Sequence, residues 1–386
     1  MFREGIEYVV YDDTLRFCGN FKSRLSEKHL DVCSSKEIKR IIFHSDTYDC
    51  SIDALSDLEN IETIHFIFLT NFFDYKEDFH MTKLDLEIFD IYHEEKKNWR
   101  EYFCDFNKPI TKYPKNIKNL VINFTQYDYE IVLPPSIEKF VVNIRIPSFP
   151  LKNLPENLKD FFLSNYNDKI LELPPNLVEL RIDYSCCDIL VLPVSLKRME
   201  FFYLEGEIGD LPDGLETLMV IGNTEIFRKY PKSLIKLKIH YSNWLMENLS
   251  ENLQKLTIYD ISEANNVNFD NLPQNLTKLR LFGRTRSNFD NLPCTLKFLD
   301  MSGLHLIDDQ PLDFLPYGLE ILKLPENKYN TPVHNLPGNL KKLFLGNDFK
   351  QEMQNLPAGL EKLFVKNPKI KGDLPETTEI IYENIF

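Results

Sequence analysis

One short unit recurs through the last two thirds of the chain, and this repetition restricts the fold more than any other sequence feature. Each unit contains a proline, usually preceded by leucine, and fourteen units follow one another at intervals of 18–23 residues. In one unit Ser250 takes the place of the proline. The frame is defined by Pro114, Pro134, Pro155, Pro174, Pro193, Pro212, Pro231, Pro273, Pro293, Pro316, Pro337, Pro357 and Pro375. These thirteen are most of the 22 prolines in the chain, so the proline excess belongs to the repeat.

Positions within each unit are numbered from its proline, so that +2 is the second residue after it. Position +2 holds Asn, Ser, Thr or Gly in all fourteen units, and position +6 holds a large apolar residue in all fourteen. Positions +3 and +8 are apolar in every unit but the last. Residues of the +2 type close turns, either in left-handed backbone conformations or through side-chain hydrogen bonds. The alternation at +6 and +8 is typical of a short strand with one buried face.

The unit is too short for a strand and a helix. About ten residues remain for the return to the next turn, so the return is predicted to be extended, polyproline-like or a single 3-10 turn. One unit cannot bury its apolar face alone, whereas stacked units bury it against one another, with their strands in a parallel sheet. The 386 residues are therefore expected to form one elongated array, whose fourteen regular strands would extend over roughly 60 Å.

The unit L-P-x-(N/S/G/T)-L-x-x-L-x-L resembles the leucine-rich repeat over residues 114–386. Leu279–Gly283 with Asn288–Pro293, and also Leu345–Phe349, resemble the FNIP-type repeat of slime moulds and giant viruses; the short unit is also similar to repeats of bacterial effector proteins. The resemblance implies a leucine-rich repeat solenoid of the α/β-type repeat class, mostly β, with an extended or 3-10 convex side and a parallel β-sheet on the concave face. It implies a non-enzymatic scaffold for protein–protein interaction. FNIP-type relatives with an F-box suggest a substrate-recognition adaptor for ubiquitin ligation, although residues 1–50 contain no convincing F-box helices.

The chain departs from the leucine-rich pattern at the interior asparagine, three residues after the last strand leucine. Few units have it (Asn223, Asn327), and other units place there Tyr166, Ser185, Leu204 and Pro368. The backbone groups that an asparagine ladder would satisfy must therefore find other partners.

The N-terminal third lacks the proline frame. Residues 1–33 are predicted to form an N-terminal cap, a β-hairpin of strands Ile6–Tyr11 and Leu15–Phe21 that turns at Asp12-Asp13. Such a cap would cover the apolar end of the array.

Residues 34–113 are interpreted as divergent early repeats. The spacing L-x-x-L-x-L recurs at 38–43, 61–66 and 81–86. It breaks at 90–108, where we expect a helical insertion.

The chain carries no motif of a familiar catalytic centre. No G-x-S-x-G, phosphate-binding glycine loop or dinucleotide fingerprint occurs, and the eight histidines are scattered. We therefore expect no catalytic residues, no cofactor and no metal. A glycan-active or hydrolytic enzyme is the remote alternative, because paired carboxylates leave no sequence motif.

Targeting features favour a cytoplasmic protein, in the host cytoplasm if the chain is viral. The charged N-terminus lacks the apolar core of a signal peptide, and no apolar run approaches the roughly 18 residues of a membrane span. Seven cysteines, scattered and without C-x-x-C, indicate reduced thiols.

Charge restricts the partners. A net charge of −14 argues against nucleic acid and against an anionic membrane. Residues 46–95 contain fourteen acidic and two basic residues, a local net of −12. This segment is either a solvated acidic face or a docking patch for a basic partner.

Outward-pointing strand residues predict where a partner binds. Positions +5 and +7 alternate with the buried leucines and should face the concave side, and aromatic residues follow at +9 and +10. The candidate partner-binding residues are Arg181, Arg198, Tyr203, Lys236, Lys238, His240, Tyr241, Lys255, Tyr259, Lys278, Arg280 and Phe282. One interpretation is that lysine is simply common on exposed strands. The other is a basic and aromatic patch that binds an acidic or phosphorylated protein segment.

The C-terminal units offer an alternative. Phe298, Ile321, Phe344 and Phe364 are expected to form an apolar strip on the same face. The chain stops soon after the last strand, with little room for a cap. An open sheet edge there would make the chain a structural or assembly protein, or a weak homodimer.

Overall fold

The structure is a computed structural model. It describes residues 8–17, 25–35, 37–43, 52–66, 109–147, 151, 153–166, 172–222, 227, 229–240, 249–262, 268–307, 311–366, 375–376 and 378–382. The chain divides into two compact units, one of Met1–Leu177 with Asp183–Cys187 and the other of Val178–Ile182 with Asp188–Phe386.

The first unit is built from strands with little helix. Its elements are β1 (Tyr8–Tyr11), β2 (Thr14–Phe17), α1 (Glu27–Ser35), β3 (Arg40–Phe43), the 3-10 turn η1 (Ile52–Leu55), β4 (Thr63–Phe66), β5 (Asn119–Tyr127), β6 (Lys139–Pro147) and β7 (Asp160–Ser164). β1 and β2 are antiparallel, and from β2 to β7 each strand pairs in parallel with the next.

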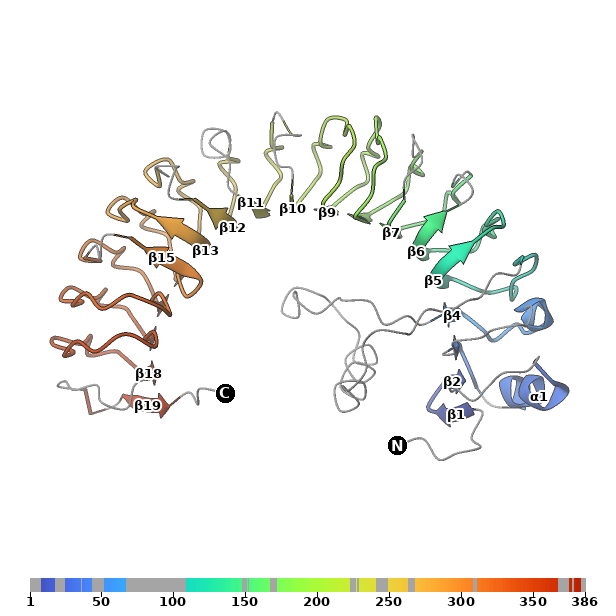
Figure 1. Ribbon diagram of the computed structural model, residues 1–386, viewed down its shortest axis with the longest axis horizontal. Helices are drawn as coiled ribbons and strands as arrows, with labels where there is room; N and C mark the ends of the chain where they lie inside the picture. Colours follow the sequence, from blue (N-terminus) through green and yellow to red (C-terminus); the bar gives the residue numbers. More distant parts are fainter. Residues whose placement is uncertain are drawn as a thin grey trace. The chain divides into compact units, whose positions relative to one another are not determined.

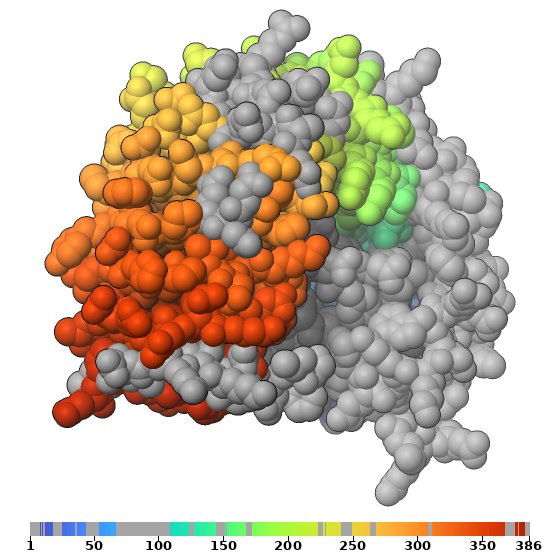
Figure 2. Space-filling view, turned by 60° about the vertical axis from the view of Figure 1, so that its left-hand side comes forward, coloured from blue at the N-terminus to red at the C-terminus, as the bar shows by residue number. Residues whose placement is uncertain are grey.

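The second unit contains the remaining strands. They are β8 (Glu179–Asp183), β9 (Arg198–Phe202), β10 (Thr217–Ile221), β11 (Lys236–His240), β12 (Lys255–Ile261), β13 (Lys278–Thr285), β14 (Phe298–Asp300), β15 (Leu304–Leu306), β16 (Ile321–Lys323), β17 (Lys342–Phe344), β18 (Lys362–Val365) and β19 (Glu379–Tyr382). The strands from β9 to β19 pair in parallel, and β14 and β15 both pair with β13. Within the unit the strands lie on the inner side of the bend and the returns on the outer side (Figure 1). The space-filling view shows its repeats as successive bands stacked on one another (Figure 2). The predicted solenoid with a parallel sheet is confirmed.

A turn follows the proline in every regular unit. In all fourteen units, the Ser250 unit included, the backbone N–H at +3 donates to the carbonyl at position 0, with N···O distances of 3.0–3.3 Å. The following residues donate to carbonyls of the preceding unit, as Lys255 does to Ile235 at 3.0 Å. The turn therefore sets the phase in which each strand joins its neighbour.

Side chains at +2 connect consecutive turns. The amides of five asparagines donate to main-chain carbonyls of the preceding unit at 2.6–3.1 Å: Asn116, Asn157, Asn176, Asn252 and Asn275. The hydroxyl of Thr295 does the same at 2.6 Å. None of the described +2 residues has a positive φ. At the asparagines and at Thr295, the side-chain hydrogen bond is therefore the role in use.

Left-handed residues lie instead at +10, where the chain leaves the strand, a feature that the sequence did not indicate. They are Asn165, Tyr184, Tyr203, Gly222, Asp260 and Gly283, with φ between 44° and 126°. At Gly283 a Cβ atom would collide with the backbone of Ile261. Tyrosine adopts this conformation at a cost of roughly 1–2 kcal/mol, which the packed neighbours must offset.

Leucine stacking forms the core. Leu237, Leu256 and Leu279 at +6 pair in register on β11, β12 and β13 and are at most 1% exposed. Each such side chain contributes about 1.5–3 kcal/mol on burial. In the first unit aromatic rings take over this role, because Phe17, Phe43 and Phe66 stack with centroids 5.2 Å apart.

Hydroxyl groups replace part of the missing asparagine ladder. The Tyr127 hydroxyl accepts a hydrogen bond from the Ile110 N–H at 3.1 Å, and the Tyr166 hydroxyl accepts one from Leu151 at 2.9 Å. Ser185 accepts from the Tyr166 N–H at 3.1 Å. Buried backbone groups on the return thus find partners without a repeated asparagine.

The N-terminal region contains a helix that the sequence analysis did not anticipate. The β1–β2 hairpin turns at Asp12, whose φ is 48°. α1 follows it, with the Ser26 N–H donating to the His29 ring at 3.0 Å and the Asn60 amide donating to the Cys33 carbonyl at 2.9 Å. The helix takes the place of an extended return between β2 and β3.

Two expected features of the N-terminal third, the repeat at 81–86 and the helical insertion at 90–108, lie outside the described residues. β4 pairs directly with β5, so no strand stands between these two.

Replacing Leu279 by alanine should lower the free energy of unfolding by about 2–5 kcal/mol, because the side chain is fully buried and a cavity would remain. Denaturant unfolding measures this change. Gln254→Ala, at an exposed position on a neighbouring unit, is the control and should stay within about 0.5 kcal/mol of the wild type. Equal stabilities for the two variants would contradict the leucine core.

Candidate functional site

Three lysines lie side by side at position +5 of three successive repeats in the second compact unit. Lys236 on β11 pairs with Lys255 on β12, which pairs with Lys278 on β13. Lys255 is exposed and the other two are half-buried. These three residues are called the lysine row. The repeat frame predicted this juxtaposition, and the strand register confirms it.

The next outward position, +7, is largely closed to solvent. Met219, Lys238 and Thr257 are paired in register and are only 3%, 4% and 7% exposed. Lys238 was expected on the binding surface, and its burial removes it from direct contact with a partner. It belongs to a middle row with residues of the lysine row on one side along the strand and +9 residues on the other. The Lys238 side chain therefore has neighbours along its own strand and on both adjacent strands, which accounts for its burial.

Position +9 carries an aromatic row of His240, Tyr259 and Phe282, all half-buried. The Tyr259 and Phe282 rings stack with centroids 5.1 Å apart at 20°, and His240 lies 6.2 Å from Tyr259. Phe282 lies where a Cβ atom on Gly303 would stand, so that glycine admits the ring. Burial lowers the pKa of His240, and the Asp260 carboxylate opposes this change. The lowered pKa favours the neutral imidazole at neutral pH.

Arg198 on β9 also stands at +5, two strands from Lys236, with Thr217 on β10 between them. Arg198 is 3.8 Å from both Glu179 and Glu200, and Arg181 is 3.9 Å from Glu200. The Arg181 guanidinium also lies 4.8 Å from the centroid of the Phe202 ring. These two arginines are therefore balanced by neighbouring carboxylates. Tyr203 is 45% exposed, in the left-handed turn beyond β9.

Arg280 and Tyr241 are the two remaining candidates. Arg280 at +7 lies 3.6 Å from the nearly buried Asp300, which also lies 3.7 Å from Lys323. Tyr241 falls outside the described residues. The structure thus brings together the lysine row, the aromatic row and Arg280 on β11–β13, and it places Arg198 two strands from Lys236 beside carboxylates of its own.

The expected apolar strip has cations over its rings. Phe344 and Phe364 stack with centroids 3.9 Å apart at 4°. Lys323 lies 5.0 Å from the Phe344 centroid, and Lys278 lies 4.6 Å from that of Phe298. Cations at these distances are attracted to the ring faces.

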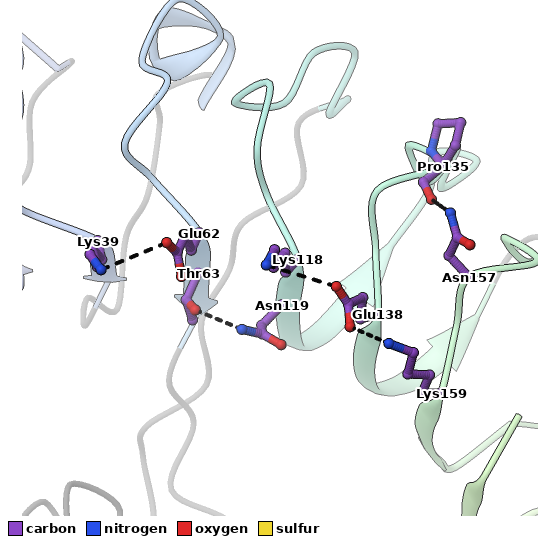
Figure 3. Close-up of polar contacts among 9 residues, drawn as sticks. All are labelled: Lys39, Glu62, Thr63, Lys118, Asn119, Pro135, Glu138, Asn157 and Lys159. Atoms are coloured by element: carbon purple, nitrogen blue, oxygen red, sulfur yellow. Dashed lines mark hydrogen bonds and ion pairs between the residues drawn. The ribbon is translucent and has the colours of Figure 1, made fainter.

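Charges elsewhere alternate from one strand to the next, which sequence reasoning had not singled out. In the first compact unit, Lys118, Glu138 and Lys159 stand at +4 of three successive repeats. Glu138 lies 3.9 Å from Lys118 and 2.7 Å from Lys159 (Figure 3). In the second unit Glu320 lies between Lys297 and Lys341, at 3.6 and 2.9 Å. Reading position +4 along the frame shows the alternation in the sequence. The lysine row lies at the adjacent position, +5, where three lysines follow one another on neighbouring strands.

A polar depression of about 590 Å³ lies along the first unit. Its lining residues are Glu59, Glu62, Asn116, Lys118, Ser136, Glu138, Asn157 and Lys159. Lys118 and Lys159 pair with Glu138, and the Asn157 amide donates to the Pro135 carbonyl (Figure 3). These polar groups already satisfy one another, so the depression is explained by the ladders that join the turns.

The described part of the chain contains two buried cysteines, Cys33 and Cys187, and two exposed ones, Cys186 and Cys294. It contains no group of three potential metal ligands. Burial raises the pKa of the Cys33 thiol to about 11, which keeps it protonated and unreactive. No helix in the described ranges combines the length and apolar character needed to cross a membrane.

Comparison with solved structures identifies the fold. CroV588, a circular leucine-rich repeat protein of the giant virus CroV, matches 97% of this chain with a TM-score of 0.51 and 21% identity, and this chain covers 66% of it. YopM from Yersinia enterocolitica matches 92% of this chain and 94% of its own length, at 16% identity and a TM-score of 0.37. A leucine-rich repeat protein from Bacteroides ovatus matches 98% of this chain and 82% of its own length, at 13% identity and a TM-score of 0.18. No family model and no curated protein matches the chain.

The likeness to CroV588 shows the fold alone. This chain spans about two thirds of that protein's length. Together with the repeat geometry, the likeness makes the fold a leucine-rich repeat solenoid with little helix.

Removing the carboxylate of Glu138 should lower stability in a pH-dependent way. The hydrogen bond from Lys159, together with the charges of Lys159 and Lys118, lowers the pKa of this carboxyl despite the opposing effect of burial. The folded-state pKa is below the unfolded one, so the contribution is present above the ordinary glutamate pKa of about 4.3 and is lost as the pH falls through the folded-state value. Glu138→Gln should therefore cost up to about 1 kcal/mol at neutral pH and nothing in acid.

Urea unfolding at neutral and acid pH, in low and high salt, measures this difference. Glu156→Gln, at an exposed +1 position, is the matched control. A loss of stability in Glu138→Gln that is the same at both pH values would show that the ion pairs do not cause it.

Proposed function

We propose that the protein is a non-enzymatic scaffold that binds an acidic or phosphorylated segment of another protein on the inner face of its second unit. The observation that carries this proposal is the lysine row, Lys236, Lys255 and Lys278, placed in register on three successive strands. Arg280 lies beside it at +7, where the Asp300 carboxylate balances its charge.

Like charges directly opposite one another on neighbouring strands are unfavourable, and the strand register places Lys236, Lys255 and Lys278 in that relation. Neighbouring strands lie about 4.8 Å apart, and two ammonium groups at about 5 Å repel by nearly 1 kcal/mol even at the dielectric constant of water. Elsewhere at +5 some strand neighbours carry opposite charges, since Lys139 lies 2.7 Å from Asp160, and others carry like charges, since Lys342 pairs with Lys362. A ligand of opposite charge would offset the repulsion within such a run of like charges.

An acidic protein segment fits this surface better than a nucleic acid or a membrane. The overall charge of −14 would repel a long phosphate backbone or an anionic bilayer beyond the lysine row. Aromatic residues beside lysines supply apolar contact area as well as charge, a combination typical of protein interfaces.

The FNIP-type resemblance extends the proposal. We propose that the repeats are of this type, as the Leu279–Pro293 segment suggests, and that the chain works in the cytoplasm, the host cytoplasm if it is viral. A substrate-recognition adaptor for ubiquitin ligation would use the same surface. We also propose the division into a cap at 1–33, divergent early repeats at 34–113 and fourteen regular repeats at 114–386.

A second candidate function is self-association through β19, giving a weak homodimer or an assembly. β19 pairs with β18 on one side, and among the described residues no strand covers its other side. Ile380 and Tyr382 on this strand are 37% and 61% exposed. An exposed apolar edge strand can pair with a second chain.

Charge reversal should separate binding from folding. The triple variant Lys236→Glu, Lys255→Glu and Lys278→Glu should lose the partners that the wild type retains in affinity purification with mass spectrometry, because it reverses the sign of the row. The control reverses three exposed lysines elsewhere, Lys229, Lys232 and Lys350, and changes the net charge equally. Unchanged capture by the first variant, with both variants folded, would overturn the assignment of the surface.

Self-association through β19 makes a different prediction. Ile380→Lys should shift the protein toward monomer in light scattering across a concentration series, because it places charge on the exposed edge. A wild type that stays monomeric at every concentration would remove this second function.

A further inference from the structure

The lysine row and the aromatic row run parallel to each other across strands β11–β13. Along each strand, +5 and +9 are four residues apart, which at about 3.3 Å per residue separates the two rows by roughly 13 Å. The middle row between them is buried at Lys238 and Thr257. A ligand therefore meets charge on one side, rings on the other and little accessible side chain between.

An extended peptide that lies along these rows, perpendicular to the strands, matches this arrangement. Its side chains point alternately to opposite sides, and those on the same side recur about every 6.8 Å. Three lysines on adjacent strands span roughly 10 Å, so two carboxylates from alternate residues lie within their reach. The intervening side chains then point to Tyr259 and Phe282, whose stacked rings offer a flat apolar surface.

A helix fits less well. Its residues face outward all round a cylinder of roughly 10–12 Å, so only one stripe reaches a sheet at a time. An acidic stripe would meet the lysine row alone, and an apolar stripe would meet the aromatic row alone. Only the two-residue period of an extended chain serves both rows at once.

We infer that this surface selects an extended segment in which acidic residues alternate with aromatic or aliphatic ones. The inference rests on the proposed function and specifies its partner. Charge complementarity fixes the acidic half of the pattern, and the aromatic row fixes the other half. The selectivity is thus for an order of residues rather than for a composition.

Two peptides of the same composition test the order. One is Asp-Phe-Asp-Phe-Asp-Phe and the other is Asp-Asp-Asp-Phe-Phe-Phe, both fluorescently labelled and titrated with the full chain in anisotropy measurements. The alternating peptide should bind at least about tenfold more tightly, because it alone engages both rows. Its affinity should fall with salt, since one half of the contact is ionic.

Single substitutions locate the two halves. Lys255→Gln should weaken the alternating peptide and reduce its salt dependence, and Tyr259→Ser should weaken it without changing that dependence. Lys232→Gln, at an exposed +1 position, is the control that should change neither. Thermal unfolding of each variant shows whether the fold is kept.

Other results would overturn the inference. Equal affinity for the two peptides would overturn the inferred preference for alternating residues but would leave the proposed function standing. The proposed function is tested separately, by the capture of partners with the charge-reversed variant. Binding of neither peptide would also remove the alternation. Tighter binding of a single-stranded oligothymidine than of the alternating peptide would assign the surface to nucleic acid and overturn both the inference and the proposed function.

Discussion

The hydrogen bond between the carbonyl at position 0 and the N–H at +3 is the constraint on which the rest of the structure depends. It forms in all fourteen regular units, and it forms even where Ser250 replaces the proline. Because it fixes where each strand begins, it aligns the leucines at +6 in one row and the outward side chains in others. A shift of one residue would exchange buried and exposed faces. The surface of the protein is therefore a direct consequence of the turn.

Much of this architecture follows from the sequence, because a repeat frame converts spacing into register. The neighbours Lys236, Lys255 and Lys278 could be predicted without any structure, since each stands five residues after the start of its unit. The burial of Lys238 could not, because exposure depends on how side chains of adjacent rows crowd one another. The left-handed residue at +10 was also missed: Tyr184 and Tyr203 adopt it although tyrosine has no preference for it. In these residues tertiary packing overrides local propensity, and a single sequence does not reveal that.

Helix α1 shows another limit of pattern reading. Its nine residues, Glu27–Ser35, are too few for a clear apolar stripe. What holds the helix is contact with the neighbouring unit: His29 is buried edge-on against Phe17, and the Asn60 amide binds the Cys33 carbonyl. Asn60 precedes Ile61 as Asn116 precedes Ile117, so the +2 function extends into the N-terminal third. The divergent repeat at Asn60 therefore makes the same side-chain hydrogen bond to the preceding repeat, although it lacks the proline.

The charged residues fall into two groups, those that pair between neighbouring repeats and those that face outward on the strands. At +4 the alternation of lysine and glutamate along Lys118, Glu138 and Lys159 links each turn to the next. These pairs are local to the stack and would serve any leucine-rich solenoid. The positions that stacking does not restrict are the outward ones on the strands, and these are free to diverge between proteins that share the fold, as the 21% identity to CroV588 allows. The outward rows are therefore where we look for function, and the lysine row beside stacked Tyr259 and Phe282 is the surface that we propose.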